Sequence, residues 1–170
     1  GGDLAGARAR RSSRDRHRMS APRATMRRLT IVRHAHAEPR EHHRDDFERR
    51  LDKRGRHEAH EIAARARALG LRPDHLISSP ADRALETARE LAKALDFPLH
   101  RIRHDDRVYL AERAQLIAIL RHAPAASEHV LLVGHNPGLS RLAEWVTGDE
   151  RLGALPTAAL VSACGELHDW

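Results

Sequence analysis

Three short motifs along the chain combine residue types that suit phosphoryl chemistry. They are Arg33-His34-Ala35-His36, the nine residues from Ser79 to Thr87, and Gly134-His135-Asn136-Pro137-Gly138. Between them these motifs supply two arginines and two histidines. An arginine offers planar, paired donors that match phosphate oxygens, and a histidine can act as a nucleophile. The set therefore predicts a site for a dianionic phosphoryl group.

Each motif lies at or directly after the end of a predicted strand. Short aliphatic runs at 29–32, 75–79 and 129–135 indicate buried strands. In an open α/β sheet, ligands bind beyond the carboxyl ends of the strands. We therefore expect the three motifs, far apart in the sequence, to meet at one edge of a sheet.

Helical patterns between the strands complete the predicted fold. They indicate helices from Asp52, as the N-cap, through Leu69 and over 80–95, 113–122 and 137–146, with a polar loop over 38–50. Gly70 stands where the end of the first helix favours a left-handed residue, and Pro80 is expected in the first turn of the second. Strands that alternate with helices predict an α/β fold, a three-layer α/β/α sandwich with a mainly parallel sheet.

Length and charge indicate one folded domain with an arginine-rich extension. The chain has 170 residues and a net charge of +6, but residues 1–28 alone carry nine Arg and two Asp. We expect residues 1–26 to be disordered and 27–170 to form the domain. The extension resembles a transit peptide, or it precedes a true start at Met19 or Met26. Because residues 29–170 hold 21 basic and 22 acidic residues, we expect no nucleic-acid binding by the domain.

Composition also restricts the compartment. Cys164 is the single cysteine, which excludes an internal disulfide framework and fits a reducing environment. The sequence has no secretory h-region and no apolar run near the ~18 residues that span a bilayer. We therefore expect a cytoplasmic protein that does not enter a membrane.

The three motifs together resemble the histidine phosphatase superfamily (phosphoglycerate mutase-like), and within it the SixA-like phosphohistidine phosphatases. The resemblance covers about residues 28–165. It is carried by Arg33-His34-Ala35, by Ser79 to Thr87 as Ser-Pro-x-x-Arg-Ala-x-[Gln/Glu]-Thr, and by Gly134-His135. Weaker matches are Leu51 with Gly55, Val108-Tyr109, and Leu155-Pro156-Thr157.

The resemblance implies a role for each motif residue. His34 would attack phosphorus and form a covalent phosphohistidine, Arg33 and Arg83 would hold the phosphoryl oxygens, and His135 would complete the cradle. Ser79 and Asn136 would be neighbours of the phosphate. Chemistry adds that His34 must be neutral at one nitrogen to attack, and that His135 is better charged or donating. No metal or other cofactor is expected, because the arginines supply the positive charge.

The substrate depends on whether an acid protonates the leaving group. Larger members of the superfamily have such an acid, and the SixA-like branch often shows a Glu directly after the tyrosine, where this chain has Leu110. Glu112 is the one nearby candidate for a general acid, and otherwise a charge that complements a helix N-terminus. A phosphohistidine leaves with less help than an alkoxide, so an acid-free site favours phosphohistidine on a protein as substrate. The chain also has no long insertion that could form a lid, which favours a shallow, open pocket.

Several alternatives stay open at this point. The protein could be a phosphomonoesterase for a small metabolite with Glu112 as acid, or a non-catalytic phosphate-binding module. His34 and His36 could ligate a metal with His42 and His43. Arg83 and Glu86 could form an ordinary surface pair on a helix. His135 could be a structural histidine.

Overall fold

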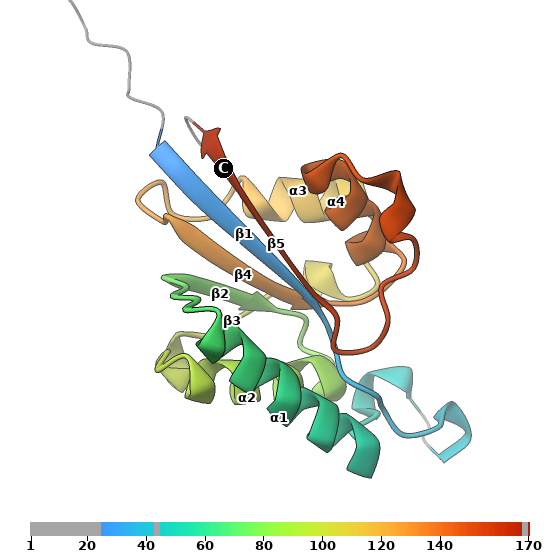
Figure 1. Cartoon of the computed structure of the whole chain (residues 1–170). Helices are drawn as coiled ribbons and strands as arrows, with labels where there is room; N and C mark the ends of the chain where they lie inside the picture. The colour runs from blue at the N-terminus through green and yellow to red at the C-terminus, as the bar shows by residue number, and fades with distance from the viewer. Residues whose placement is uncertain (1–24, 43–44, 168–169) are drawn as a thin grey trace, which may run out of the picture.

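A five-stranded sheet forms the centre of the computed structural model, which describes residues 25–42, 45–167 and 170 (Figure 1). The strands lie in the order β3-β2-β4-β1-β5. Strands β1 to β4 run parallel to one another, and β5 pairs antiparallel with β1. Their bounds are β1 Thr25–Arg33, β2 His75–Ser78, β3 Arg103–His104, β4 His129–Gly134 and β5 Leu160–Leu167. The predicted α/β fold with a mainly parallel sheet is confirmed.

Four helices cover the two faces of the sheet. Helices α1 and α2 lie on one face, and α3 and α4 on the other, as Figure 1 shows. Their bounds are α1 Lys53–Ala68, α2 Asp82–Ala94, α3 Arg113–Leu120 and α4 Gly138–Thr147. Five short 3₁₀ turns, η1 to η5, lie in the connections of the described part; they are Arg40–His42, Asp46–Glu48, Leu99–Arg101, Asp106–Val108 and Glu150–Leu152.

Alternation along the strands divides the core into two layers. In β1, Ile31 packs into the cluster below α3 and α4, while the next residue, Val32, packs into the cluster below α1 and α2. In β4, Leu132 and Leu131 divide in the same way. All four side chains are fully buried, as expected for a parallel sheet that is covered on both faces.

The first helix begins and ends as its sequence predicts, but the second does not. The Asp52 carboxylate accepts a hydrogen bond from the Gly55 backbone N–H at 2.7 Å, and Gly70 has φ +67° just after α1. Pro80, expected in the first turn of the second helix, lies before it, because Ala81 is the N-cap of α2. The predicted position of Pro80 is therefore wrong by two residues.

The structure adds elements that the sequence did not indicate. Strands β3 and β5 were not predicted, and β1 begins at Thr25, inside the segment expected to be disordered. The rest of that segment, residues 1–24, lies outside the described residues. Within the described ranges, no helix is long and apolar enough to cross a membrane.

Candidate active site

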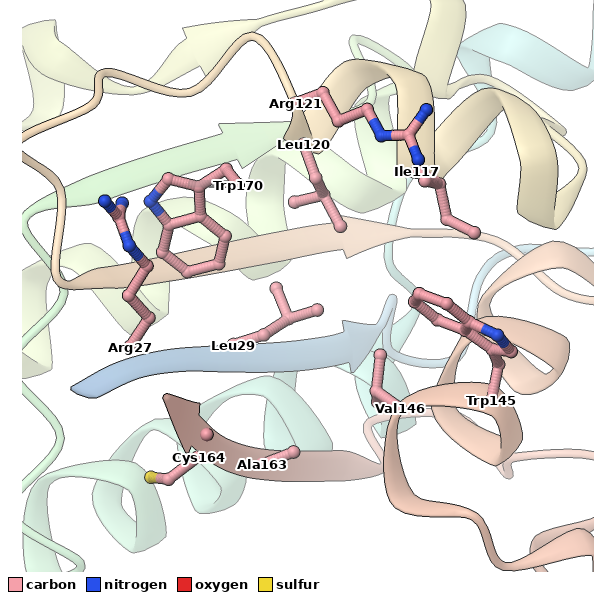
Figure 2. Close-up of a pocket in the computed structure, with 11 residues that line it drawn as sticks. Arg27, Leu29, Ile117, Leu120, Arg121, Trp145, Val146, Ala163, Cys164 and Trp170 are labelled. Atoms are coloured by element: carbon pink, nitrogen blue, oxygen red, sulfur yellow. The ribbon is translucent and has the colours of Figure 1, made fainter. Parts of the chain in front are cut away.

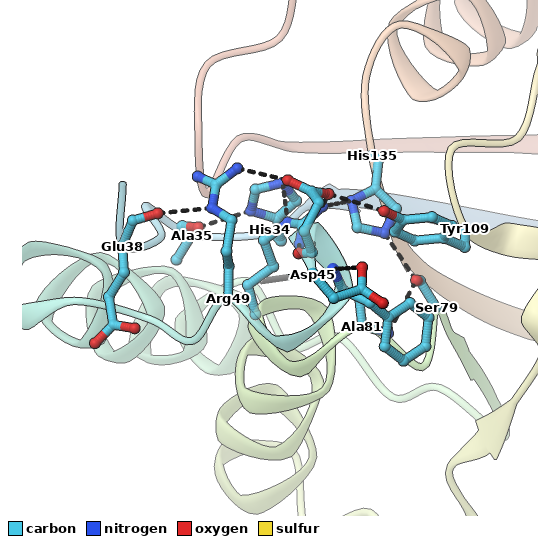
Figure 3. Close-up of polar contacts among 12 residues, drawn as sticks. His34, Ala35, Glu38, Asp45, Arg49, Ser79, Ala81, Tyr109 and His135 are labelled. Carbon is cyan, nitrogen blue, oxygen red and sulfur yellow. Dashed lines mark hydrogen bonds and ion pairs between the residues drawn. The ribbon is translucent and has the colours of Figure 1, made fainter. Parts of the chain in front are cut away.

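The carboxyl ends of β1, β2 and β4 bring the three motifs together. Arg33, at the end of β1, is in register with Gly134 of β4, and Ser78 of β2 is in register with Val133. The residues that follow therefore leave the sheet side by side. Figure 3 shows His34, Ser79 and His135 meeting at this edge.

His34 is oriented by its own neighbour in the chain. Its Nδ1 lies 2.7 Å from the Ala35 carbonyl oxygen, so Nδ1 carries the hydrogen and Nε2 keeps a lone pair. The residue is only 9% exposed. Burial, together with the charges of Arg83 and Arg33, lowers the pKa of His34 to about 4, although the bond to Ala35 opposes this. His34 is thus neutral at pH 7, and its Nε2 is unprotonated and keeps a nucleophilic lone pair.

His135 lies next to His34, and their ring centroids are 5.1 Å apart. Its Nε2 is 2.7 Å from the Ser79 hydroxyl, and its Nδ1 is 3.5 Å from Nη2 of Arg83. Burial, followed by the neighbouring His34 and Arg83, lowers the pKa of His135 to about 2. The ring is therefore neutral in the ligand-free protein, and the expected role of His135 as a charged group or a donor toward phosphate stays a prediction.

Arg83 reaches the same point from the first turn of α2. Its side chain is 4% exposed, and its Nε donates to His34 Nε2 across 3.3 Å. Its two terminal nitrogens contact Asp46, at the carbonyl oxygen (2.6 Å) and at the carboxylate (2.8 Å). Arg83 is therefore no surface partner of Glu86, whose carboxylate binds Arg50 and the Leu51 backbone.

Arg33 and Asn136 donate to the same backbone oxygen. Nη1 of Arg33 and Nδ2 of Asn136 both donate to the Leu155 carbonyl oxygen, at 2.6 and 2.8 Å. The Nε of Arg33 is buried and has no hydrogen-bond partner among the described residues. An unsatisfied buried donor is costly, but Nε of Arg27, outside this pocket, is in the same state, so the feature is not specific to a phosphate site.

A cavity of about 340 Å³ opens above these groups. Its buried floor holds His34, Arg83 and His135, and its rim includes Leu110, which is 53% exposed. The remaining lining residues are Arg33, Arg40, Asp46, Arg49, Tyr109 and Asn136. The pocket thus combines four arginines with one carboxylate, a composition that suits a dianion.

Arg40, Asp46 and Arg49 line the pocket although none of the three motifs contains them. All three lie in the segment interpreted as a polar loop; Asp46 begins the 3₁₀ turn η2 and Arg49 directly follows it. Arg49 is held by Glu38, whose carbonyl oxygen accepts from its Nε at 2.7 Å, and by the Asp46 carboxylate. The local signal in the sequence was the spacing of Asp46 three residues before Arg49, which lets the two side chains pair.

Gly55 accounts for one of the weaker sequence matches. A Cβ at Gly55 would lie 1.7 Å from the backbone oxygen of His36, so only glycine lets α1 approach the segment after His34 so closely. The His36 backbone N–H also donates to Glu58 on the same helix. Helix α1 therefore fixes the backbone that carries the nucleophile candidate.

The family comparison agrees with this geometry. The sequence pattern of the histidine phosphatase superfamily (branch 1) matches residues 29–114, half of the chain. The protein belongs to this superfamily. No curated protein matches the sequence.

Several solved phosphatase structures share the fold. A protein from Agrobacterium tumefaciens assigned as a phosphohistidine phosphatase SixA is 30% identical, with a TM-score of 0.73, and the match covers 80% of this chain and 90% of that one. A protein histidine phosphatase SixA in complex with tungstate is 22% identical (TM-score 0.65; coverage 79% and 86%). A mycobacterial glucosyl-3-phosphoglycerate phosphatase is 20% identical (TM-score 0.62; coverage 83% and 91%). The last two similarities establish the fold alone.

Glu112, the candidate acid, does not line the pocket of this histidine phosphatase. It is exposed at the N-cap of α3, where it forms a reciprocal capping box with Gln115. This position matches the alternative role of Glu112 as a charge at a helix N-terminus.

The metal alternative finds no matching geometry in the described residues. Within them, no three His, Cys, Asp or Glu side chains gather as metal ligands would. His36 turns from His34 toward Asp52, and its Nδ1 lies 2.7 Å from that carboxylate. His43, a suggested ligand, lies outside the described residues.

A second cavity, of about 400 Å³, shares no lining residue with the pocket around His34. Figure 2 shows the residues that line it. It is bounded by Leu29 of β1, Ile117 of α3 and Trp145 of α4, and most of its lining is apolar. Its buried arginine, Arg27, already donates to the carbonyl oxygens of Ser127 and Ala125. No histidine lines this cavity, so among the described residues it does not combine an imidazole with its arginines as the pocket around His34 does.

Proposed function

We propose that this histidine phosphatase works without a metal, through a phosphohistidine formed on His34, and that it removes phosphate from phosphohistidine on another protein. Arg33 and Arg83 hold the phosphoryl oxygens, and His135 completes the cradle. The described pocket supports these roles by its neutral, oriented His34 and its surrounding arginines.

The proposed reaction has two steps, formation of a phosphohistidine and its hydrolysis. First, the lone pair of His34 Nε2 forms a bond to phosphorus while the bond from phosphorus to the leaving nitrogen breaks, and its electron pair stays on that nitrogen. Then water attacks the phosphohistidine, the bond to Nε2 breaks, inorganic phosphate leaves, and the proton of water passes to phosphate or solvent. Such transfers depend on in-line positioning and on neutralising the equatorial oxygens, which arginines do here.

His135 gains a proton or donates one hydrogen bond when the substrate binds. It is neutral in the ligand-free protein because of burial. A dianion beside it favours the charged form of the ring. The hydrogen bond between Nε2 of His135 and the Ser79 hydroxyl, 2.7 Å long in the ligand-free protein, can then be replaced by one from His135 to phosphate.

One observation favours phosphohistidine as the substrate: in the described part of the chain, Asp46 is the one carboxylate that lines the pocket. Burial alone would raise the pKa of Asp46, but hydrogen bonds from Arg49 and Tyr109 and the charge of Arg83 hold it well below its usual range. Asp46 therefore stays ionised and cannot protonate a leaving group. An imidazole needs no such acid when its ring carries its own proton, whereas an alkoxide does.

A metabolite phosphatase is the second candidate. A cavity of about 340 Å³ is large enough for a small ligand, since such sites start at about 300 Å³. This candidate lacks an acid in the described pocket, because Glu112 caps α3 instead. The exposed rim at Leu110 suits a phosphorylated side chain on a protein surface better than an enclosed metabolite.

The test compares wild type, His34→Ala and His36→Ala in EDTA. The substrates are a phosphohistidine-bearing phosphotransfer protein, p-nitrophenyl phosphate, and a panel of sugar and nucleotide phosphates. We expect turnover of the phosphohistidine protein, loss of that turnover in His34→Ala, and little change in His36→Ala, whose side chain points to Asp52. Wild type quenched in base should carry base-stable, acid-labile phosphate on His34.

Each other outcome changes the assignment. Faster turnover of alkyl phosphates than of the phosphohistidine protein would identify a metabolite phosphatase. Activity that survives in His34→Ala would remove His34 as the nucleophile. Binding of phosphate without turnover of any substrate would identify a binding module.

A further inference from the structure

The carboxylate of Asp46 joins three pocket side chains that come from separate segments. Its Oδ1 accepts from Nη1 of Arg49 at 2.8 Å. Its Oδ2 accepts from Nη2 of Arg83 and from the hydroxyl of Tyr109, both at 2.8 Å. Arg49, Tyr109 and the neighbouring His34 and His135 are seen together in Figure 3.

The contacts to Asp46 determine where the Arg83 guanidinium points. Two of its nitrogens are taken by the carboxylate and the carbonyl oxygen of Asp46. A guanidinium is rigid and planar, so fixing both terminal nitrogens also fixes Nε. That third nitrogen is the one that lies 3.3 Å from His34 Nε2.

The same carboxylate supports His135 through Tyr109. The Tyr109 ring meets the His135 ring edge-on, with centroids 5.4 Å apart, and meets Phe47 in the same way at 5.1 Å. The hydroxyl bond to Asp46 fixes the tyrosine ring between them. Asp46 thus connects both sides of the phosphoryl cradle.

We propose that Asp46 is a positioning residue of the phosphoryl site, which acts by aiming Arg83 at the attacking nitrogen and holding Tyr109 against His135. The inference rests on the proposed attack by His34. On this proposal Asp46 keeps its contacts to the arginines during the reaction, whereas a mere competitor would be displaced by the phosphoryl group. Asp46 also does not act on the leaving group.

An amide cannot replace this carboxylate. The side chain of Asn presents one acceptor oxygen and an NH₂ group, and the NH₂ would face one of the three donors. Replacing a residue that orients a metal ligand typically lowers activity roughly 10- to 100-fold, and we take the same scale for a carboxylate that orients an arginine. For Asp46→Asn we expect a fall in kcat of this size, with kcat and kcat/KM reduced equally, because the contact matters in the transition state.

The experiment measures Asp46→Asn, Arg83→Lys and the double variant on p-nitrophenyl phosphate and on the phosphohistidine protein. We expect the same fold-loss on both substrates, since Asp46 acts on the phosphoryl cradle and not on the leaving group. We also expect the loss to shrink in the Arg83→Lys background, because Asp46 acts through Arg83. Glu86→Gln is the matched control, because Glu86 links α2 to the neighbouring Arg50 and Leu51 outside the pocket.

Three results would overturn the inference. The first is an unchanged kcat of Asp46→Asn with tighter inhibition by inorganic phosphate, which indicates that Asp46 competes with phosphate. The second is a loss of kcat on the phosphohistidine protein only, which indicates action on the leaving group. The third is full additivity of the kcat losses of Asp46→Asn and Arg83→Lys in the double variant. If Asp46→Asn does not fold, Asp46→Glu keeps the charge but displaces it by one methylene. It should then lower kcat, and wild-type kcat would overturn the proposal. Failure of the proposed function is visible separately, as turnover that survives in His34→Ala.

Discussion

Nε of Arg83 points at Nε2 of His34 across 3.3 Å, so the guanidinium donates to the lone pair proposed to attack phosphorus. If phosphorus approaches Nε2 of His34 as proposed, Nε of Arg83 can donate to a phosphoryl oxygen in place of the histidine. The guanidinium is therefore already directed at the proposed attacking nitrogen in the ligand-free protein.

Arg83→Lys tests this preorganisation. The lysine keeps the charge but loses the planar fork, and it cannot bind Asp46 and face His34 together. Removing one preorganised donor costs roughly 10²- to 10³-fold in kcat in comparable sites. We expect a loss in that range in steady-state kinetics with p-nitrophenyl phosphate. Arg50→Lys, at an exposed arginine paired with Glu86, serves as the control. A value for Arg83→Lys within twofold of wild type would contradict the preorganisation.

The protonation state of His34 gives a second prediction. Burial, with Arg83 and Arg33 nearby, lowers the pKa of His34 to about 4, and Nδ1 is the protonated nitrogen. We therefore expect His34 to remain the neutral Nδ1–H tautomer at pH 5.5, where an unperturbed histidine of pKa about 6.5 is mostly charged. Long-range ¹H–¹⁵N spectra of the imidazole rings measure both the tautomer and the titration. A charged His34 ring at pH 6 would refute the prediction.

Gly55→Ala should damage both stability and activity. The new Cβ would lie 1.7 Å from the His36 backbone oxygen, so α1 or the segment after His34 has to move. Overpacking of this kind costs roughly 1–3 kcal/mol in the free energy of unfolding. Displacement of the segment by about 1 Å would lower kcat by about 10²-fold. Gly165→Ala, with open space around its Cβ, should change neither by much. Urea unfolding and kinetics on both variants test this, and equal effects would refute it.

The sequence predicted the groups whose place follows from strand ends. Arg33 and His135 each follow a continuous apolar run, and the parallel arrangement of two such runs forces their ends together. Ser79 follows from the same rule. For this reason the edge of the sheet, and these three polar residues on it, could be located without coordinates.

The rest of the pocket depends mainly on contacts between segments that are far apart in the sequence. Asp46 and Arg49 lie in a polar segment without periodicity. Arg83 and Tyr109 donate to the carboxylate of Asp46, which in turn accepts from Arg49. Strand β5 was missed because its sequence, LVSACGEL, mixes small, polar and apolar residues and pairs only along the edge of β1. Glu112 could not be separated from a catalytic acid until the capping box showed where its side chain binds.

Acid pH should destabilise the fold well above the range where carboxylates titrate. Burial lowers the pKa of His34 to about 4 and that of His135 to about 2, below the value of about 6.5 that both have when unfolded. Between the folded-state pKa of each histidine and about 6.5, the unfolded chain binds more protons than the folded one. The free energy of unfolding therefore rises with pH in this window, and this contribution to stability is lost progressively as the pH falls below about 6.5. Each group contributes at most about 1.4 kcal/mol per pH unit in this window.

Urea unfolding at pH 7, 6 and 5 measures this slope. Burial also lowers the pKa of His75 and of His129, so they add in the same direction. The pKa of Asp46 is lowered, so its contribution is present above about 3.9 and is lost only at lower pH. His135→Asn should reduce the slope between pH 6 and 5 by about one proton's worth. A free energy of unfolding that is constant or increases from pH 7 to pH 5 would show that the two site histidines take up protons in the folded protein.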